Sequence, residues 1–281
     1  MHSTYNCLVL FSGGLDSILA CKVLQSQGLR PLGIHFVSPF FGHPDRIESW
    51  QIMYGLDILP ADISDDFVSL LNSGPCWGWG KHLNPCVDCK ILMLQRANEM
   101  MPSLGAGFLA TGEVLGQRPM SQRKDALHII HREAGVQDIL VRPLSGKLMP
   151  KTAVEEQGLV DREQLLGIKG RGRKEQLHLA QTFNLPEIPT PAGGCLLTDP
   201  EHVKRFRPLM THLECPSVHD FHLAITGRQL WAEKHWLVVG RNQQDNEKLA
   251  NQVLAQDLVF KMATIPGPLA LGRQFKGPWP Q

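Results

Sequence analysis

The chain has 281 residues, and its 28 lysine and arginine residues against 27 aspartate and glutamate residues give a formal net charge of +1. This length allows one large domain with a smaller one attached, and a hydrophobic content of 43% is that of an ordinary globular protein. The near-neutral charge excludes a global attraction to nucleic acid, so an RNA partner would have to bind local basic clusters. The apolar run near the N-terminus is too short for a signal peptide or a membrane span, which predicts a cytoplasmic protein with no membrane partner.

Strand and helix signals alternate from the N-terminus onward. Apolar runs predict strands over residues 7–11, 31–37, 108–111 and 139–141. Helices are expected between and after them, over residues 15–27, 87–101 and 121–134. This alternation predicts an α/β fold in which a parallel sheet carries helices on both faces. Ligands of such sheets bind at the carboxyl ends of the strands.

The second part of the chain has a different pattern. Residues 185–200 contain four prolines and the pair Gly193-Gly194, which predicts an ordered loop. A basic helical stretch then leads to Cys215-Pro216, where we place the boundary between a first domain, 1–215, and a second, 216–281. Strands near 221–226, 236–239 and 258–262 and a helix at about 246–255 predict a small α+β domain.

The segment Ser12-Gly13-Gly14-Leu15-Asp16-Ser17 joins the first predicted strand to the first helix. Backbone N–H groups at a helix N-terminus, two hydroxyls and two glycines without bulk suit a pyrophosphate, although an ordinary turn also uses such residues. It is not a Walker A loop, since no Gly-Lys-Ser/Thr follows. The six residues resemble the PP-loop, SGGxDS, of the ATP pyrophosphatases. This resemblance implies the HUP-like sheet of that family and the cleavage of ATP to AMP and pyrophosphate.

Cysteines form a second candidate site. Cys86 and Cys89 are spaced as CxxC in Asn84-Pro85-Cys86-Val87-Asp88-Cys89-Lys90, at the start of a predicted helix whose dipole lowers thiol pKa values. The pair is interpreted as a redox pair, as half of a zinc site completed by Cys76 or a histidine, or as buried thiols. A third cysteine, Cys195, follows two glycines. Cys7 and Cys21 lie on apolar faces and are expected in the core.

Four motifs occur in the order found in tRNA thiolation enzymes. After the PP-loop come Asn-Pro-Cys-x-x-Cys-Lys, the segment Thr111-Gly112-Glu113-Val114-Leu115-Gly116-Gln117, and Gly-Gly-Cys. The third motif resembles the tRNA 4-thiouridine synthetases, whereas the cysteine contexts are shared with the tRNA 2-thiouridylases. Across residues 5–200 this resemblance implies that Cys86, Cys89 and Cys195 ligate a 4Fe–4S cluster with one open iron. Relatives without a cluster instead form a persulfide on one cysteine and resolve it with another. By that resemblance, Cys195 would carry the persulfide sulfur in this chain and Cys89 would complete the exchange.

Two regions are predicted to contact RNA. The basic segment 169–174 contributes Arg171, Arg173 and Lys174, and a further basic run spans 204–207; each is otherwise a solvated helix face. Residues 236–249 resemble the core of the NFACT RNA-binding domain, with a Pro-Gly turn at 265–268. That resemblance places Arg241 on a phosphate, with Asn242 and Asn246 shaping the turn, although a plain hairpin turn is the alternative.

These features together predict an ATP-dependent tRNA sulfurtransferase that adenylates a uridine oxygen and replaces it with sulfur, 4-thiouridine being favoured over 2-thiouridine. Cys86, Cys89, Cys195 and Asp16 are the expected catalytic residues. ATP and Mg²⁺ would bind at residues 12–17. Main-chain groups of Ile34, His35 and Phe36 would bracket the adenine, and the adenylate side would be lined by Thr111, Gly112, Glu113 and Gln117. The partners would be tRNA and a sulfur donor, either inorganic sulfide or a persulfide of the cysteine-desulfurase type. The alternatives are a PP-loop ligase or amidotransferase with an amine nucleophile, and an RNA-binding protein with a nucleotide-sensing domain.

Overall fold

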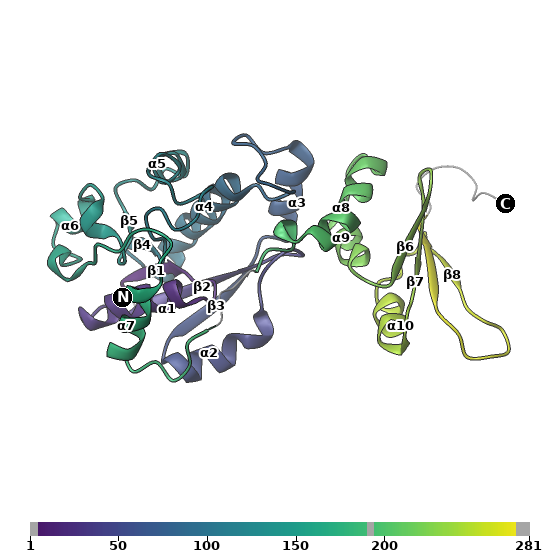
Figure 1. Cartoon of the computed structure of the whole chain (residues 1–281), viewed down its shortest axis with the longest axis horizontal. Coiled ribbons are helices and arrows are strands. Elements are labelled where there is room, and N and C mark those ends of the chain that lie inside the picture. The colour runs from purple at the N-terminus through teal and green to yellow at the C-terminus, as the bar shows by residue number, and fades with distance from the viewer. Residues whose placement is uncertain (1–4, 190–193, 274–281) are drawn as a thin grey trace. The chain divides into compact units, whose positions relative to one another are not determined.

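The computed structural model describes residues 5–189 and 194–273, which form two compact units (Figure 1). The first unit comprises Met1–Ile63, Pro75–Gly80 and Asn84–Cys195. The second comprises Ser64–Gly74, Lys81–Leu83 and Leu196–Gln281. The compact division therefore falls before residue 215, and the assignment of functional domains to 1–215 and 216–281 stays a prediction.

The first unit is built on a five-stranded parallel sheet in the order β3-β2-β1-β4-β5. Its strands are β1 (Cys7–Leu10), β2 (Pro31–Val37), β3 (Asp57–Asp62), β4 (Phe108–Thr111) and β5 (Leu140–Val141). Leu10 in β1 is in register with Ile34 on one side and with Thr111 on the other. The segments that follow β1 and β4 therefore start side by side at one edge of the sheet.

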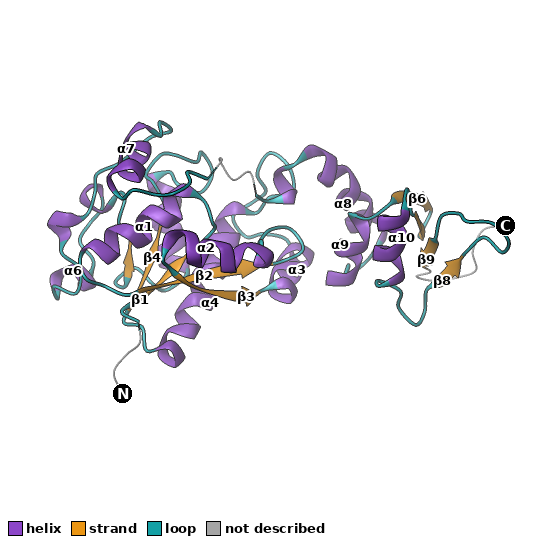
Figure 2. Cartoon of the chain, turned by 90° about the horizontal axis from the view of Figure 1, so that it is seen from below, coloured by secondary structure: helices purple, strands orange, loops and turns teal. Residues whose placement is uncertain are grey.

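Helices cover both faces of this sheet, as the sequence predicts (Figure 2). They are α1 (Leu15–Ser26), α2 (Ile47–Tyr54), α4 (Cys86–Leu104), α5 (Lys124–Glu133), α6 (Ala153–Glu156) and α7 (Lys174–Thr182), with short 3-10 turns at Pro44–Arg46, Gly146–Leu148 and Arg162–Gln164. Successive β1 side chains point to opposite faces. Val9 accordingly packs in a cluster with residues of α1 and α2, whereas Leu8 packs in another with residues of α4 and α5.

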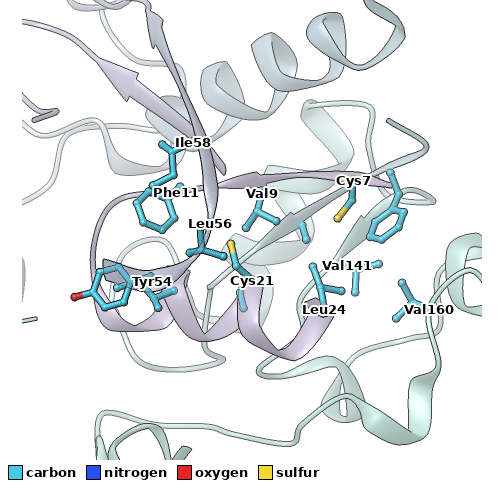
Figure 3. Packing of buried hydrophobic residues seen from close by; sticks show 14 of the residues in the cluster. Cys7, Val9, Phe11, Cys21, Leu24, Tyr54, Leu56, Ile58, Val141 and Val160 are labelled. Atoms are coloured by element: carbon cyan, nitrogen blue, oxygen red, sulfur yellow. The ribbon is translucent and has the colours of Figure 1, made fainter. Parts of the chain in front are cut away.

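Cys7 and Cys21 are core residues, as expected from the sequence. Both belong to the hydrophobic cluster of β1, α1 and α2 and have at most 1% of their surface exposed (Figure 3). Burial raises the pKa of Cys21 to about 12 and raises that of Cys7 as well. These two thiols stay protonated at neutral pH and have no part in the chemistry discussed below.

The second unit contains a four-stranded antiparallel sheet in the order β6-β7-β9-β8. Its strands are β6 (Arg228–Ala232), β7 (His235–Val239), β8 (Leu258–Phe260) and β9 (Ala270–Arg273), and its helices are α3 (Ser64–Ser73), α8 (Pro200–His212), α9 (Val218–Ala224) and α10 (Gln243–Ala250), with a 3-10 turn at Leu196–Thr198. This agrees with the predicted small α+β fold. The predicted loop over 185–200 includes residues 190–193, which lie outside the described residues.

The strand expected over 221–226 is wrong, because α9 occupies most of that run. Ser217 caps the helix, and its side chain and that of Asp220 bond each other's backbone N–H groups as a capping box. The apolar residues Phe221 and Ala224 are three positions apart and both buried. The run therefore has helical rather than alternating spacing.

Arg273 fastens the central strand β9 of this sheet to two other segments. Its guanidinium is 3% exposed and bonds Asp220 at 2.5 Å and Asp257 at 2.8 Å. Its cationic carbon also lies 5.9 Å from the Trp236 ring, which stacks on Trp231 at 5.0 Å. Within the described part of the chain, no helix is long and apolar enough to cross a membrane.

Candidate active site

The turn after β1 carries the predicted phosphate loop. Gly13 has a φ of +74°, a left-handed conformation that glycine adopts without strain, and a Cβ there would lie 2.4 Å from the ring of Trp50. Trp50, in α2, is buried and also meets the rings of Phe11 and His35 edge to face. Glycine is thus required at position 13 for two reasons: the backbone is left-handed there, and the Trp50 ring leaves no room for a Cβ.

Hydroxyl groups close the loop on itself. Ser17 Oγ donates to the Gly14 carbonyl at 2.8 Å and accepts the Ser12 N–H at 3.3 Å, and the Gly14 N–H donates to Ser12 Oγ at 3.4 Å. Gly14 caps α1 without a side chain, so the first N–H groups of this helix have no side-chain acceptor. Free N–H groups at a helix N-terminus favour an anion, in agreement with the predicted pyrophosphate site.

The segment after β4 lies directly against this loop. A Cβ on Gly112 would lie 2.5 Å from the backbone carbonyl carbon and oxygen of Asp16. Gln117 Nε2 donates to Asp16 Oδ2 at 2.8 Å, while Asp16 Oδ1 is buried and has no hydrogen-bond partner among the described residues. The two motifs therefore meet, as predicted from the strand ends, and the orphaned carboxylate oxygen fits an Mg²⁺ ligand.

Glu113 belongs to a buried ion pair at the same strand end. Its Oε2 accepts from Arg142 Nε at 3.0 Å and from Thr111 Oγ1 at 3.2 Å, and neither charged side chain is more than 3% exposed. Glu113 Oε1 and Arg142 Nη2 are both buried without a partner in the described residues. Leaving buried polar atoms without hydrogen bonds costs free energy. A polar ligand group that bonds the open acceptor and the open donor of this pair would remove that cost.

His131 lies near this ion pair on α5. Burial, followed by the Arg142 charge, lowers the pKa of His131 to about 4. Its Nε2 is 3.2 Å from His128 Nδ1. His131 is therefore neutral at physiological pH.

The residues predicted at the adenine are all buried at the end of β2. Ile34 accepts the Phe11 N–H through its carbonyl at 2.9 Å. His35 Nδ1 lies 2.9 Å from the Phe11 carbonyl and its Nε2 accepts the His43 N–H at 2.8 Å, so Nδ1 carries the proton. Burial lowers the pKa of His35, which keeps the ring neutral. Both ring nitrogens of His35 are therefore engaged within the fold, and contacts of Ile34, His35 and Phe36 with adenine stay predictions.

The CxxC pair stands at the first turn of α4, which begins at Cys86. Asn84 Nδ2 donates to Cys86 Sγ at 3.1 Å and is 3.7 Å from the Met120 sulfur. Because Met120 follows the Thr-Gly-Glu segment by a few residues, this contact connects the cysteines with the segment that holds Asp16.

The expected lowering of thiol pKa values by the helix is wrong for Cys89. Its pKa is raised, first by burial and then by the nearby Cys195 and Cys86 thiols, and Lys90 opposes this only in part. Cys195 and Cys86 thus lie near enough to Cys89 to raise the pKa of its thiol, and a ligand role for the three cysteines stays a prediction. Within the described residues, no group of three His, Cys, Asp or Glu side chains is already arranged to hold a metal ion.

The predicted RNA-binding residues differ in their surroundings. Arg171 and Lys174 are exposed and Arg173 is partly so, and none of them forms an ion pair in the described part of the chain. Arg241, in the second unit, is paired with Asp245 at 2.6 Å. Contact with RNA stays a prediction for these four residues and for Asn242, the fifth residue predicted to bind RNA.

The two asparagines do shape the turn of the second unit, as predicted. Asn242 caps α10 by accepting the Asp245 N–H at 2.9 Å. Asn246 Oδ1 accepts the Leu269 N–H at 2.9 Å. In the basic run 204–207, Lys204 pairs with Glu201 and Arg205 donates to the Ala224 and Gly227 carbonyls, so part of this run is structural.

Three residues of the site were not foreseen from the sequence. Trp50 supports the phosphate loop, Arg142 holds Glu113, and the fully buried Gln176 donates to Gln117 at 3.4 Å. Trp50 and Arg142 act across long stretches of chain, and no local spacing marks them. Gln176 lies two residues after the basic segment 169–174, and its burial is not marked by the charged residues around it.

Comparison with known proteins gives limited similarity. No family model matches the chain. An uncharacterised protein of Methanocaldococcus jannaschii is 27% identical over 133 residues, which are 45% of this chain and 45% of that protein. The match therefore spans less than half the length of this curated relative.

Several solved structures match the chain at low identity and low TM-score. A predicted subunit of a tRNA methyltransferase from M. jannaschii is 17% identical, with a TM-score of 0.39, over 63% of this chain and 75% of that one. A 4-thiouridine synthetase in complex with RNA and ATP is 17% identical, with a TM-score of 0.41, over 75% of this chain and 52% of that one. The U34-tRNA thiolase NcsA of Methanococcus maripaludis, with its 4Fe–4S cluster, is 15% identical, with a TM-score of 0.38, over 75% of this chain and 74% of that one.

Proposed function

We propose that the protein is an ATP-dependent tRNA sulfurtransferase, which activates a uridine oxygen with AMP and replaces it with sulfur, 4-thiouridine being favoured over 2-thiouridine. One observation carries the proposal: the segment 117–120 touches both halves of the required chemistry. Gln117 bonds Asp16 of the phosphate loop, and Met120 contacts Asn84, which donates to Cys86. The predicted phosphate loop and the CxxC motif are thereby joined through four consecutive residues.

In the first step, the uridine oxygen attacks the α-phosphorus of ATP, and the bond from that phosphorus to the bridging oxygen of pyrophosphate breaks. Ser12, Ser17 and the N–H groups at the start of α1 would hold the departing pyrophosphate. Asp16 Oδ1 would hold Mg²⁺, and Gln117 fixes the orientation of that carboxylate through its other oxygen. Glu113, held by Arg142, would accept a hydrogen bond from the adenylate side.

In the second step, a sulfur nucleophile bonds to the ring carbon, and the bond from that carbon to the AMP oxygen breaks. Cys86, Cys89 and Cys195 would hold the 4Fe–4S cluster, which when bound supplies an open iron for the sulfur to be transferred. Asn84 donates a hydrogen bond to Cys86 Sγ, which stabilises negative charge on that sulfur. The target base has to leave its stack, and this costs a few kcal/mol unless the tRNA is already irregular there.

The proposal is tested by incubating unmodified tRNA with the anaerobically reconstituted protein, ATP, Mg²⁺ and inorganic sulfide, and analysing the nucleosides by mass spectrometry. We expect thiouridine from the wild type, none from Cys86→Ser or Cys195→Ser, and wild-type amounts from the control Cys215→Ser, which alters an exposed thiol of the second unit. AMP formation without thiouridine, unaffected by the cysteine changes, would contradict the proposal in favour of an amine-using ligase. Thiouridine formed by iron-free protein when a protein persulfide replaces inorganic sulfide as the donor would instead assign the transfer to a persulfide.

A further inference from the structure

The segment Pro75–Gly80 has the sequence Pro-Cys-Trp-Gly-Trp-Gly, and we call it the tryptophan loop. Trp77 is 40% exposed and Trp79 is 41% exposed, although tryptophan is usually among the more buried residues. Within the described residues, neither ring contacts another aromatic ring. The loop therefore leaves about two fifths of the surface of each tryptophan open to solvent.

Hydrogen bonds to Asp88 attach the start of the tryptophan loop to the CxxC motif. Asp88, which lies between the two cysteines and is only 8% exposed, accepts the N–H of Cys76 at 2.8 Å and that of Trp77 at 3.2 Å. A carboxylate that accepts two backbone N–H groups forms strong, charge-assisted hydrogen bonds. The position of the first tryptophan is thus set by a residue of the cysteine motif.

The other end of the loop is fixed beside Cys86. The Gly80 N–H donates to the Asn84 carbonyl at 2.9 Å, and a Cβ on Gly80 would overlap the Asn84 side chain. The same Asn84 side chain donates to Cys86 Sγ. Both ends of the tryptophan loop are therefore held by residues within or next to the CxxC motif, whose two thiols, Cys86 and Cys89, are each partly exposed.

The chemistry of the loop fits a nucleobase better than a protein partner. Apart from the two tryptophans, it contains no charged or long aliphatic side chain, and glycines separate the rings, so a continuous apolar patch of the kind found in protein interfaces is missing from it. Isolated aromatic faces are what single-stranded RNA uses for stacking.

We propose that Trp77 and Trp79 stack on unpaired bases of the tRNA at the target uridine and so hold that uridine beside Cys86. This inference rests on the proposed thiolation. It gives the displaced base a stacking surface in place of the one it leaves, which offsets part of the cost of extruding it. The tryptophans are positioning residues, since the chemistry itself belongs to the nucleotide loop and the cysteines.

The test compares Trp77→Ala, Trp79→Ala and the conservative Trp77→Phe and Trp79→Phe, with Leu159→Ala as the control for an exposed apolar residue elsewhere in the first unit. Affinity is measured for unmodified tRNA and for a short uridine-rich single-stranded RNA, together with thiouridine yield and RNA-independent AMP formation. We expect each alanine variant to bind about 5- to 100-fold more weakly, with phenylalanine restoring most of the affinity. Without RNA, hydrolysis of ATP by water to AMP and pyrophosphate should stay at the wild-type level.

The outcomes separate this inference from the proposed function. If the wild type thiolates tRNA and the alanine variants match Leu159→Ala in affinity and yield, the stacking inference is wrong while the function stands. If the alanine variants keep their RNA affinity but lose thiolation only with a protein persulfide donor, the loop docks the donor and the inference is again wrong. If the wild type makes no thiouridine but its RNA affinity depends on the two rings, the function fails and the stacking surface is supported.

Discussion

Gly112→Ala is the sharpest single test of the contact between the two nucleotide motifs. The new Cβ would lie 2.5 Å from the Asp16 carbonyl carbon and oxygen and 2.7 Å from the Ser17 N, and all three are backbone atoms without the freedom of a side-chain end. To reach an ordinary contact of 3.4 Å, the phosphate loop has to retreat by about 0.9 Å. Overpacking of this kind costs about 1–3 kcal/mol in stability.

The larger effect is expected on catalysis. A displacement of about 1 Å at a catalytic group reduces rates by roughly 100-fold, because the reacting atoms lose their alignment. The assay measures ATP affinity, pyrophosphate release and the melting temperature of Gly112→Ala. Its control is Gly107→Ala at the opposite end of β4, where the nearest atom to the new Cβ is the Asn6 carbonyl oxygen at 3.7 Å.

The expected pattern is a loss of pyrophosphate release in Gly112→Ala and wild-type behaviour in Gly107→Ala. Should Gly112→Ala release pyrophosphate within twofold of both other proteins, the close approach of the two motifs would have no part in ATP binding. A large loss of stability in both variants would instead show that β4 tolerates no added methyl group at either end.

Three further predictions follow from the same contacts. Asp16→Asn should retain the fold and the Gln117 contact but lose pyrophosphate release, since the amide is a poor Mg²⁺ ligand; normal release at saturating Mg²⁺ would contradict this. The pKa of His131 is about 4 in the folded protein and near 6.5 in the unfolded chain, so the free energy of unfolding falls as the pH decreases through that window. Chemical denaturation at pH 7.5 and pH 5 should therefore show a smaller loss of unfolding free energy for His131→Gln than for the wild type. Arg241→Ala should weaken tRNA binding and reduce its salt slope by about one unit, and an unchanged slope would mean that the Asp245 pair already uses this charge.

The sheet strands that could be predicted from the sequence are those buried on both faces. The bounds of β2 and β4 agree with the predicted ranges, because continuous apolar runs mark interior parallel strands. The strand β3 was not foreseen. It lies at the edge of the sheet, contains Pro60 and alternates between exposed and less exposed residues, all of which weaken the strand signal.

The candidate site was predictable where a motif is local and unpredictable where it depends on a distant partner. The phosphate loop and the CxxC pair are contiguous, and the meeting of Ser12–Ser17 with Gly112 follows from the parallel order of β1 and β4. Nothing near Arg142 in the sequence indicates Glu113 as its partner. The raised pKa of Cys89 was likewise unpredictable, because the helix dipole is visible in the sequence whereas the depth of burial is not.

The placement of β9 imposes an order of assembly on the second unit. Residues 270–273 form β9 between β7 and β8, so β8 emerges from the ribosome before β9, the strand with which it pairs in the described sheet. Until then its backbone donors and acceptors form an unprotected edge, and Asp220 and Asp257 lack the Arg273 guanidinium that neutralises them. A chain that terminates before residue 270 lacks β9, so the sheet has unpaired strand edges and the two carboxylates lack their arginine partner. Such a chain is expected to be degraded by proteases or to aggregate.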